Sequence, residues 1–391
     1  MKRYITFIFS ILASILIINA SSPQEQIDKI MKTRYEINTP GAAIMILKGD
    51  SILMEKYYGI ADIETKEPIS ADTRFNIASI SKQFTVVGAL RLVEQGKISL
   101  DMPLGTQFPQ YCNPFWNDIK LWHLMSHTSG LPDSRDRSNK DKCIFATDST
   151  SMSYFPSIKE LRFSPGEYYD YKNPTFLLIA QIIEKHEGLK FIDYQEQYIF
   201  TPLGMTSTTY FNPTFTPEHT AHGYINTNAS SLSSTDNDTA GKTIEISNNN
   251  TLIWQEYDYG EETFFATRPD GGIYSTIRDL ARWEKGLREN KIISDSLLNI
   301  AYTPHITVSG SKWSSYQNRP NTYYGLGWFI DKTPGFPTKI YHTGDNGGFQ
   351  AYLAKYPEKE ITIIILENRN DNDRWTLATA IDNILKTCGF L

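Results

Sequence analysis

Apolar runs at both ends of the chain predict β-strands. Residues 42–59 hold two such runs, which meet at Gly49-Asp50, a dipeptide typical of a hairpin turn. Four further strand-like runs follow near the other end, at residues 322–330, 339–344, 348–357 and 360–368. A helical pattern over residues 374–386 closes the chain. We therefore expect the two ends to pair into one sheet.

The middle of the chain carries apolar residues at helical spacing instead. Residues 79–94, 174–185 and 275–287 predict helices, and Thr276 is a candidate N-cap for the last of them. Residues 227–262 are dense in Asn, Ser, Thr and Asp, which predicts a long surface loop or a small insertion. The predicted fold class is α+β. An antiparallel sheet formed from the N- and C-terminal segments and flanked by helices (about residues 25–85 and 265–391) carries a mainly α-helical inserted domain at about 86–264.

Two cations and an apolar run at the N-terminus predict a secretory signal peptide. Lys2 and Arg3 precede apolar residues 4–18, and small residues follow up to Ser22. The run falls short of the roughly 20 apolar residues that a membrane-spanning helix needs. We expect residues 1–20 to be a leader, cut after Ala20 or after Ser22, and residues 21–391 to be one periplasmic or secreted domain without a stable membrane anchor.

Composition narrows the class of protein. The 391 residues include 38 Lys and Arg against 44 Asp and Glu, a net charge of −6, and this acidic balance argues against a nucleic-acid partner. An apolar content of 40% is enough for a sizeable core without disulfide staples. Cys112 and Cys143 are able to pair and leave Cys388 alone, but spacing does not decide the pairing.

No cysteine cluster predicts a metal site, and the histidines give only a weak signal. His123 and His127 stand four residues apart, a spacing that can place two ligands on one helix face. No Glu follows His123, as the HExxH motif would require. We interpret both as structural histidines, and we expect neither a metal nor a cofactor.

A serine and a lysine at helical spacing are the first candidates for chemistry. A serine hydroxyl is a weak nucleophile until a nearby base takes its proton. Ser79 and Lys82 stand three residues apart at the start of a predicted helix, so their side chains share a face. The same Ser-x-x-Lys pattern recurs at Ser309 and Lys312, but in a Gly/Ser-rich segment without helical periodicity.

Two short motifs add candidate acid, base and binding groups. Tyr-x-Asn occurs five times, and only Tyr171 with Asn173 follows a Pro-Gly turn and precedes an apolar helix. His342-Thr343-Gly344 occurs once, between two strand-like runs. There Thr343 can donate a hydroxyl hydrogen bond, and Gly344 would let a substrate backbone approach the strand closely.

Taken in order, these motifs give the chain a family resemblance. It resembles the serine β-lactamase and penicillin-binding-protein superfamily, on the branch of class C β-lactamases, D-stereospecific peptidases and related esterases. The resemblance covers nearly all of residues 21–391. Further matching segments are LMSHTSGLPD (124–133), SPGEYYDYKN (164–173), IFTPLGM (199–205), AHGY (221–224), DGGIYSTIRDLARW (270–283) and YGLGW (324–328).

The resemblance implies a role for each motif residue. Ser79 would be the acylated nucleophile, and Lys82 would ease its deprotonation. Tyr171 would shuttle the proton to the leaving group and then activate water, which requires a pKa depressed by the nearby Lys82 cation. Asn173 would hydrogen-bond the substrate amide and Lys82. The backbone N–H groups of Ser79 and Asp345 would form the oxyanion hole.

One departure from the family pattern bears on substrate choice. His342 stands where efficient β-lactamases of this type usually carry a lysine that holds the substrate carboxylate. A histidine with an ordinary pKa would bind an anion more weakly and in a pH-dependent way. We expect an exported serine hydrolase for small-molecule or peptide substrates, cleaving peptides, amides or esters, with little or no β-lactam turnover. The alternatives are a true class C-like β-lactamase and a non-catalytic penicillin- or peptidoglycan-binding module.

Two aromatic residues near the end of the chain have two interpretations. Tyr323 and Trp328 either line the cleft or pack in the sheet.

Overall fold

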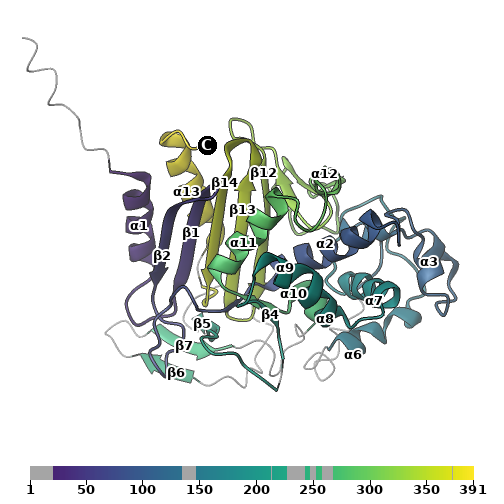
Figure 1. The fold of residues 1–391 in the computed structure, drawn as a ribbon, viewed down its shortest axis with the longest axis horizontal. Helices are drawn as coiled ribbons and strands as arrows, with labels where there is room; N and C mark the ends of the chain where they lie inside the picture. The colour runs from purple at the N-terminus through teal and green to yellow at the C-terminus, as the bar shows by residue number, and fades with distance from the viewer. Residues whose placement is uncertain are drawn as a thin grey trace, which may run out of the picture.

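An eight-stranded antiparallel sheet joins the two ends of the chain (Figure 1). The computed structural model describes residues 21–133, 147–212, 214–226, 243–246, 252–257, 267–371 and 373–391. In the strand order β2-β1-β14-β13-β12-β11-β10-β9, the N-terminal hairpin pairs directly with the C-terminal strand. The strands are β1 (Ala42–Lys48), β2 (Ser51–Tyr58), β9 (Ile306–Thr307), β10 (Thr322–Tyr324), β11 (Phe329–Asp331), β12 (Lys339–Asn346), β13 (Phe349–Tyr356) and β14 (Ile361–Glu367).

The predicted sheet and its N-terminal hairpin are therefore confirmed, with one correction. The run over residues 322–330 is not a single strand. It forms β10 and β11, which pair antiparallel across a turn in which the Gly325 N–H donates to the Trp328 carbonyl at 2.8 Å. Gly327 within this turn has φ +86°, a conformation that favours glycine, so the two glycines break the strand that the apolar pattern predicts.

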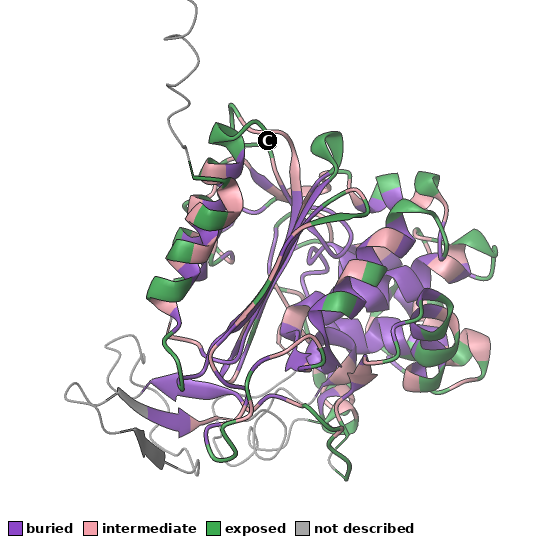
Figure 2. Ribbon diagram, turned by 60° about the vertical axis from the view of Figure 1, so that its left-hand side comes forward, coloured by how far each residue is buried: buried purple, intermediate pink, exposed green. Residues whose placement is uncertain are grey.

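The sheet is covered on both faces, and each face has its own apolar core. β1 and β14 are apolar almost without interruption because both of their faces are buried. Ile44 and Ile46 of β1 belong to the core under α1 (Pro23–Arg34) and α13 (Arg374–Thr387), whereas Met45 belongs to the core shared with the helical part. Figure 2 shows the sheet nearly edge-on between these two layers.

The helical layer contains the three helices that the apolar spacing predicts. They are α2 (Ser81–Glu94), α7 (Thr175–Glu187) and α11 (Ile277–Arg288). Thr276 caps α11 as predicted, because its side chain accepts from the Asp279 N–H at 3.2 Å. The other helices of the described residues are α3 (Leu104–Gln107), α4 (Leu121–Met125), α6 (Asp148–Met152), α8 (Phe191–Gln195), α9 (Thr201–Leu203), α10 (Arg268–Gly271) and α12 (Asp295–Ala301), with short turns η1 (Ala78–Ile80), η2 (Pro114–Asn117), η3 (Phe155–Ser157), η4 (Glu196–Phe200) and η5 (Pro357–Lys359).

Two small antiparallel sheets lie beside the main one. The first contains β3 (Phe75–Asn76), β8 (Ile273–Ser275) and β4 (Thr209–Tyr210). In the sequence, β3 comes just before the turn that carries Ser79. The second pairs β5 (Tyr224–Asn226), β7 (Leu252–Glu256) and β6 (Thr243–Ile246). The described parts of the polar segment 227–262 are thus strands rather than a continuous loop, and the rest of that segment lies outside the described residues.

The remaining expectations concern cysteines and the leader. Cys112 and Cys388 are exposed free thiols, and Cys143 lies outside the described residues, as do residues 1–20. Within the described ranges, no helix has the length and apolar character to cross a bilayer. The boundaries of the helical insertion at residues 86 and 264 stay a prediction.

Candidate active site

Ser79 lies in a strained turn directly before α2. It is the middle residue of η1, and the preceding Ala78 has φ +45°, which is unusual for a residue with a side chain. The Ala78 N–H donates to Asn76 Oδ1 at 2.8 Å, which helps to hold this conformation. The turn leaves Ser79 partly exposed while both of its neighbours are buried.

Lys82 reaches back from the first turn of α2 to the serine. Its Nζ atom lies 3.0 Å from Ser79 Oγ and 2.8 Å from the backbone carbonyl of Asp270 in α10. The side chain is fully buried, and Nζ lies 5.0 Å from the centre of the Tyr171 ring. The predicted Ser-x-x-Lys geometry is therefore present, with the amine held between the nucleophile and a fixed carbonyl.

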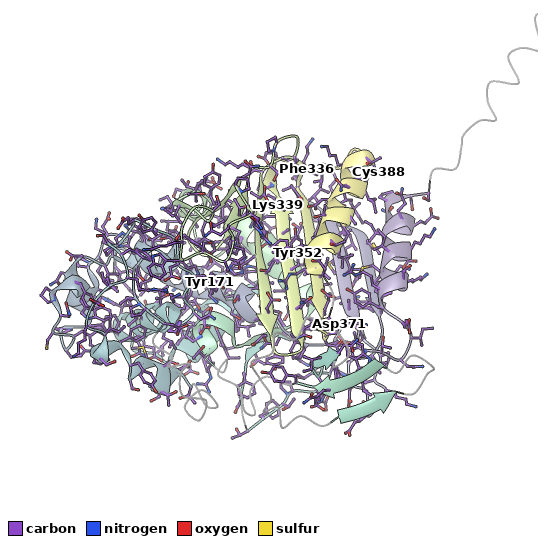
Figure 3. The ribbon with its side chains drawn as sticks, turned by 180° about the vertical axis from the view of Figure 1, so that it is seen from behind. Tyr171, Phe336, Lys339, Tyr352, Asp371 and Cys388 are labelled. Carbon is purple, nitrogen blue, oxygen red and sulfur yellow. The ribbon has the colours of Figure 1, made fainter. Side chains whose placement is uncertain are left out.

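Tyr171 completes the cluster from a different part of the chain. It precedes α7, lies where the helical part meets the sheet (Figure 3), and shares a side-chain hydrogen bond with Ser79. Burial raises the pKa of Tyr171 well above its ordinary value, and the bond to Ser79 lowers it only in part. The expected depressed pKa of Tyr171 is therefore wrong for this resting structure, and the phenol is protonated near neutral pH.

Asn173 and Thr343 come from the helical part and from the sheet, respectively. Asn173 precedes α7, and its Oδ1 atom is buried without a hydrogen-bond partner among the described residues. Thr343 lies on β12, is nearly buried and pairs in register with Tyr352 of β13. An unpaired buried acceptor is costly unless a ligand supplies its donor, and the substrate-binding role of Asn173 stays a prediction.

The packing of Gly344 against the Ser79 turn leaves no room for a side chain. A Cβ atom at this position would lie 2.3 Å from the Ile77 carbonyl oxygen and 3.0 Å from Ala78 Cβ. The turn that carries the nucleophile therefore approaches Gly344 closely, and the approach of a substrate backbone to this strand stays a prediction. This contact brings the next residue, Asp345, beside the Ser79 turn, and its oxyanion role stays a prediction.

The Asp345 side chain is occupied by a neighbouring cation. Arg374, the first residue of α13, donates to both carboxylate oxygens of Asp345 at 2.8 and 2.7 Å and to the Gly344 carbonyl at 2.9 Å. The arginine is nearly buried, so the pair fixes the end of β12.

The structure corrects the expected role of the His342 side chain. It is buried, its Nδ1 lies 2.7 Å from the Thr343 carbonyl, and its Nε2 lies 3.0 Å from the Tyr324 hydroxyl. Nδ1 must donate to the carbonyl, so Nε2 accepts from Tyr324. Burial and the Lys82 cation lower the pKa of His342 to about 3. A neutral ring with both nitrogens occupied does not provide the expected pH-dependent contact with an anion.

Sequence reasoning missed three contributors to the site. Asp270 acts through its backbone carbonyl, Tyr324 through its bond to His342, and Arg374 through Asp345. The first two lie in segments that match the family, DGGIYS and YGLGW, which was the available signal. Tyr324, not Tyr323, contacts the site, and Trp328 is buried with its ring 5.2 Å from that of Tyr302.

The sequence of this chain is similar to those of proteins in a known family. The chain belongs to the Beta-lactamase family, whose model matches residues 25–386. The penicillin-binding protein 4* of Bacillus subtilis is 25% identical over 362 residues, covering 91% of this chain and 74% of that protein. The protein flp of Staphylococcus aureus (strain MW2) is 25% identical over 356 residues, covering 89% of this chain and 63% of that protein.

Solved structures share the fold. The octameric penicillin-binding protein homologue from Pyrococcus abyssi superposes with a TM-score of 0.74 and 24% identity, covering 94% of this chain and 77% of that one. The D-amino acid amidase from Ochrobactrum anthropi SV3 gives a TM-score of 0.71 and 21% identity, covering 94% and 97%. The family and the Ser–Lys–Tyr cluster together define a serine hydrolase of the β-lactamase and penicillin-binding-protein superfamily, which acts through an acyl-enzyme.

Proposed function

We propose that this protein is an exported serine hydrolase that acylates Ser79 and cleaves amides, peptides or esters, of the D-peptidase or esterase type, with little or no β-lactam turnover. The observation that carries the proposal is the buried Lys82 amine held 3.0 Å from Ser79 Oγ beside Tyr171. The partner is a small-molecule or peptide substrate, not a nucleic acid.

The acylation step follows from these contacts. Lys82 acts as the base in its neutral amine form, after losing a proton to solvent: Ser79 Oγ attacks the substrate carbonyl carbon as its proton passes to Lys82 Nζ, and the carbonyl oxygen becomes an oxyanion. The proton on Lys82 later replaces the one that Tyr171 gives to the leaving group. The bond to the leaving group then breaks. Because burial keeps Tyr171 protonated, its hydroxyl is suited to donate a proton to the departing nitrogen or oxygen. Water next attacks the acyl-enzyme, returns a proton to the site and releases the acid.

The preference against β-lactams rests on the charges along β12. His342 is neutral, Lys339 pairs with Asp382 at 2.9 Å, and Arg374 pairs with Asp345. Lys339 and Arg374 thus already have acidic partners, and the Arg319 guanidinium, which also lies against this strand, donates to the Tyr341 hydroxyl at 3.3 Å. A substrate with a free carboxylate at this end would find little compensation for losing its water, whereas a neutral amide or ester needs none.

Matched substrates test this preference. We would compare a D-amino-acid amide, a short acyl ester, a peptide ending in D-Ala-D-Ala as free acid and as amide, and a chromogenic cephalosporin. We expect kcat/KM at least tenfold higher for the amide-terminated peptide than for the free acid. Faster hydrolysis of the cephalosporin than of every ester and amide would instead establish a β-lactamase.

A non-catalytic binding module is the remaining alternative. Labelling with a fluorophosphonate followed by peptide mapping separates the two, because an activated serine forms a stable adduct. We expect one adduct on Ser79. The absence of an adduct, together with tight penicillin binding without turnover, would support the binding module.

Export is proposed from the N-terminal pattern alone. Mass spectrometry of protein recovered from culture fractions would locate the mature N-terminus, which we expect at Ser21 or Pro23. Recovery of full-length chain beginning at Met1 from the cytoplasmic fraction alone would contradict this part of the proposal.

A further inference from the structure

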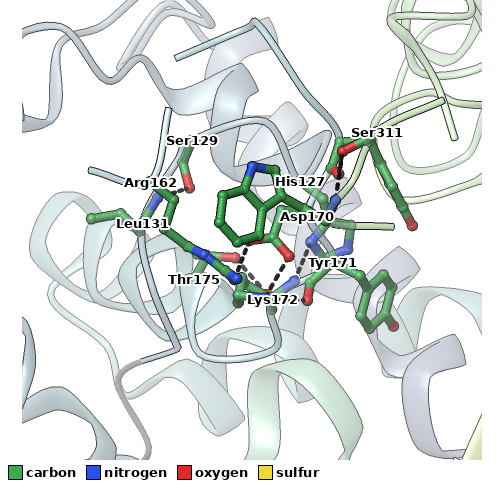
Figure 4. A network of polar contacts seen from close by, with 11 residues as sticks. His127, Ser129, Leu131, Arg162, Asp170, Tyr171, Lys172, Thr175 and Ser311 are labelled. Atoms are coloured by element: carbon green, nitrogen blue, oxygen red, sulfur yellow. Dashed lines mark hydrogen bonds and ion pairs between the residues drawn. The ribbon is translucent and has the colours of Figure 1, made fainter. Parts of the chain in front are cut away.

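His127 makes a pair of contacts that bracket Tyr171. Its backbone carbonyl accepts from the Asp170 N–H at 2.9 Å, and its Nδ1 accepts from the Lys172 N–H at 3.1 Å (Figure 4). One residue therefore fixes the backbone immediately before and immediately after the tyrosine. Its ring also lies against the phenol ring, with centroids 4.1 Å apart.

The backbone of His127 has a strained conformation at the place where it makes these two hydrogen bonds. Its φ is +57°, in the left-handed region that residues with a Cβ seldom adopt. The flanking carboxylate is held as well, because Asp170 pairs with Arg162 at 2.6 Å and with Lys172 at 2.5 Å. The Tyr171 segment is thus anchored both by the histidine and by the ion pairs of the buried Asp170.

The chemistry of the ring shows that packing alone does not explain a histidine here. Since Nδ1 accepts, the proton of the neutral ring is on Nε2, and that atom is buried without a hydrogen-bond partner among the described residues. A buried donor without an acceptor is destabilising. Burial and the Lys82 cation hold the pKa of His127 well below its ordinary value, so Nδ1 stays an acceptor.

We propose that His127 is the positioning residue for Tyr171, holding the phenol at Ser79 through its two backbone hydrogen bonds and its ring contact. This inference rests on the proposed function, in which Tyr171 protonates the leaving group. A His127 variant should therefore lose activity to an extent that depends on the leaving group. The reason is that p-nitrophenolate departs without taking up a proton, whereas an aniline must be protonated as it leaves.

His123 provides a matched control from the same segment. Its Nδ1 also accepts a backbone N–H, that of Lys120 at 3.0 Å, and it is similarly buried, with its ring against Trp122. His123→Phe therefore removes the same kind of hydrogen bond as His127→Phe, but away from Tyr171. His127→Asn keeps an acceptor near the Nδ1 position and suits a positive φ, although it loses the ring.

The experiment measures kcat/KM for a p-nitroanilide and a p-nitrophenyl ester of the same acyl group. We expect His127→Phe to lower the value at least tenfold for the anilide and threefold or less for the ester, with His127→Asn losing less on the anilide. His123→Phe should lower both equally, by under threefold. Equal losses on both substrates in His127→Phe, or a larger anilide loss in His127→Asn than in His127→Phe, would overturn the proposal.

Failure of the proposed function would look different. If wild-type protein hydrolyses neither substrate, or if Ser79→Ala retains full turnover, the proposed function fails. Crystal structures of the two variants then test His127 without any turnover. We expect the Tyr171 ring to be displaced from Ser79 in His127→Phe and to keep its place in His123→Phe, and an undisplaced ring in His127→Phe would overturn the positioning role.

Discussion

Two regions of the molecule contain the same two sequence motifs, Ser-x-x-Lys and Tyr-x-Asn, but one region is largely buried and the other is a loop. Ser79, Lys82 and Tyr171 come from distant segments and meet in a largely buried cluster. Residues 309–318 hold another Ser-x-x-Lys and another Tyr-x-Asn within one loop. There Ser309 lies 3.3 Å from the Thr307 hydroxyl, and the exposed Lys312 lies over the Trp313 ring.

The difference shows what turns a residue pattern into a reactive group. A lysine one helical turn from a serine, held by the Asp270 carbonyl and shielded from water, acts directly on that hydroxyl. A lysine exposed on a loop is solvated and does not. Matched substitutions in the two regions should therefore differ widely in their effect on activity.

Ser79→Ala should abolish turnover, whereas Ser309→Ala should not. Removing the nucleophile of a serine hydrolase costs on the order of 10⁴-fold or more in kcat. The loop variant should stay within twofold of wild type, as measured by hydrolysis of the best ester or amide. Comparable losses in the two variants would mean that Ser79 is not the nucleophile.

Tyr171→Phe should lower kcat by about 10²- to 10⁴-fold, because it removes the only proton on the ring that can pass to the leaving group. Tyr316→Phe, in the Tyr-x-Asn of the 309–318 loop, should lose less than about threefold. The comparison is best made on a p-nitroanilide, and thermal unfolding of both variants serves as the control. A Tyr171→Phe variant with normal anilide turnover would remove the tyrosine from the mechanism.

Gly344→Ala should impair both activity and stability more than Gly310→Ala. The added methyl at residue 344 would press on the Ile77 carbonyl, and overpacking of this kind costs about 1–3 kcal/mol. Activity should fall about tenfold or more because the Ser79 turn moves. Gly310 has open space around it and φ +83°, so its cost is backbone strain of about 1–2 kcal/mol with turnover retained. Denaturant unfolding and kcat/KM together check both expectations.

The smallest effect concerns pH. The pKa of His342 is about 3 in the folded protein, below the ordinary 6.5, so its contribution to stability is complete above pH 6.5 and is lost as pH falls from 6.5 toward 3. His342→Gln should therefore make the decline of Tm between pH 7 and pH 4 shallower. The exposed His219, whose pKa is raised by Glu67, provides the control, and His219→Gln should leave this decline nearly unchanged. Equal slopes in His342→Gln and wild type would contradict the assignment.

Much of this architecture follows from patterns that sequence reasoning can use. Continuous apolar runs at β1 and β14 predict strands buried on both faces, and Ser79, Lys82 and Tyr171 were found from motif order and local context. What escaped depends on tertiary surroundings. The Asp270 carbonyl is a backbone group that any residue would supply, so no side-chain pattern marks it.

The errors have the same origin. A lysine near a tyrosine predicts a lowered pKa, but desolvation by burial raises the pKa of Tyr171 well above its ordinary value. A histidine in a binding motif predicts a polar contact with substrate, but His342 is turned inward to Tyr324 and its own strand. In both cases the sequence identifies the residue, and burial decides its protonation state.

The contact of Gly344 with the turn before Ser79 has a consequence for the order of events during synthesis. The nucleophile's segment leaves the ribosome more than 250 residues before the strand that packs against it. Until β12 docks, nothing holds the Ala78 conformation from that side, and the amide proposed to receive the oxyanion does not yet exist. The complete reactive site therefore forms only after β12 has been synthesised and has docked against the Ser79 turn.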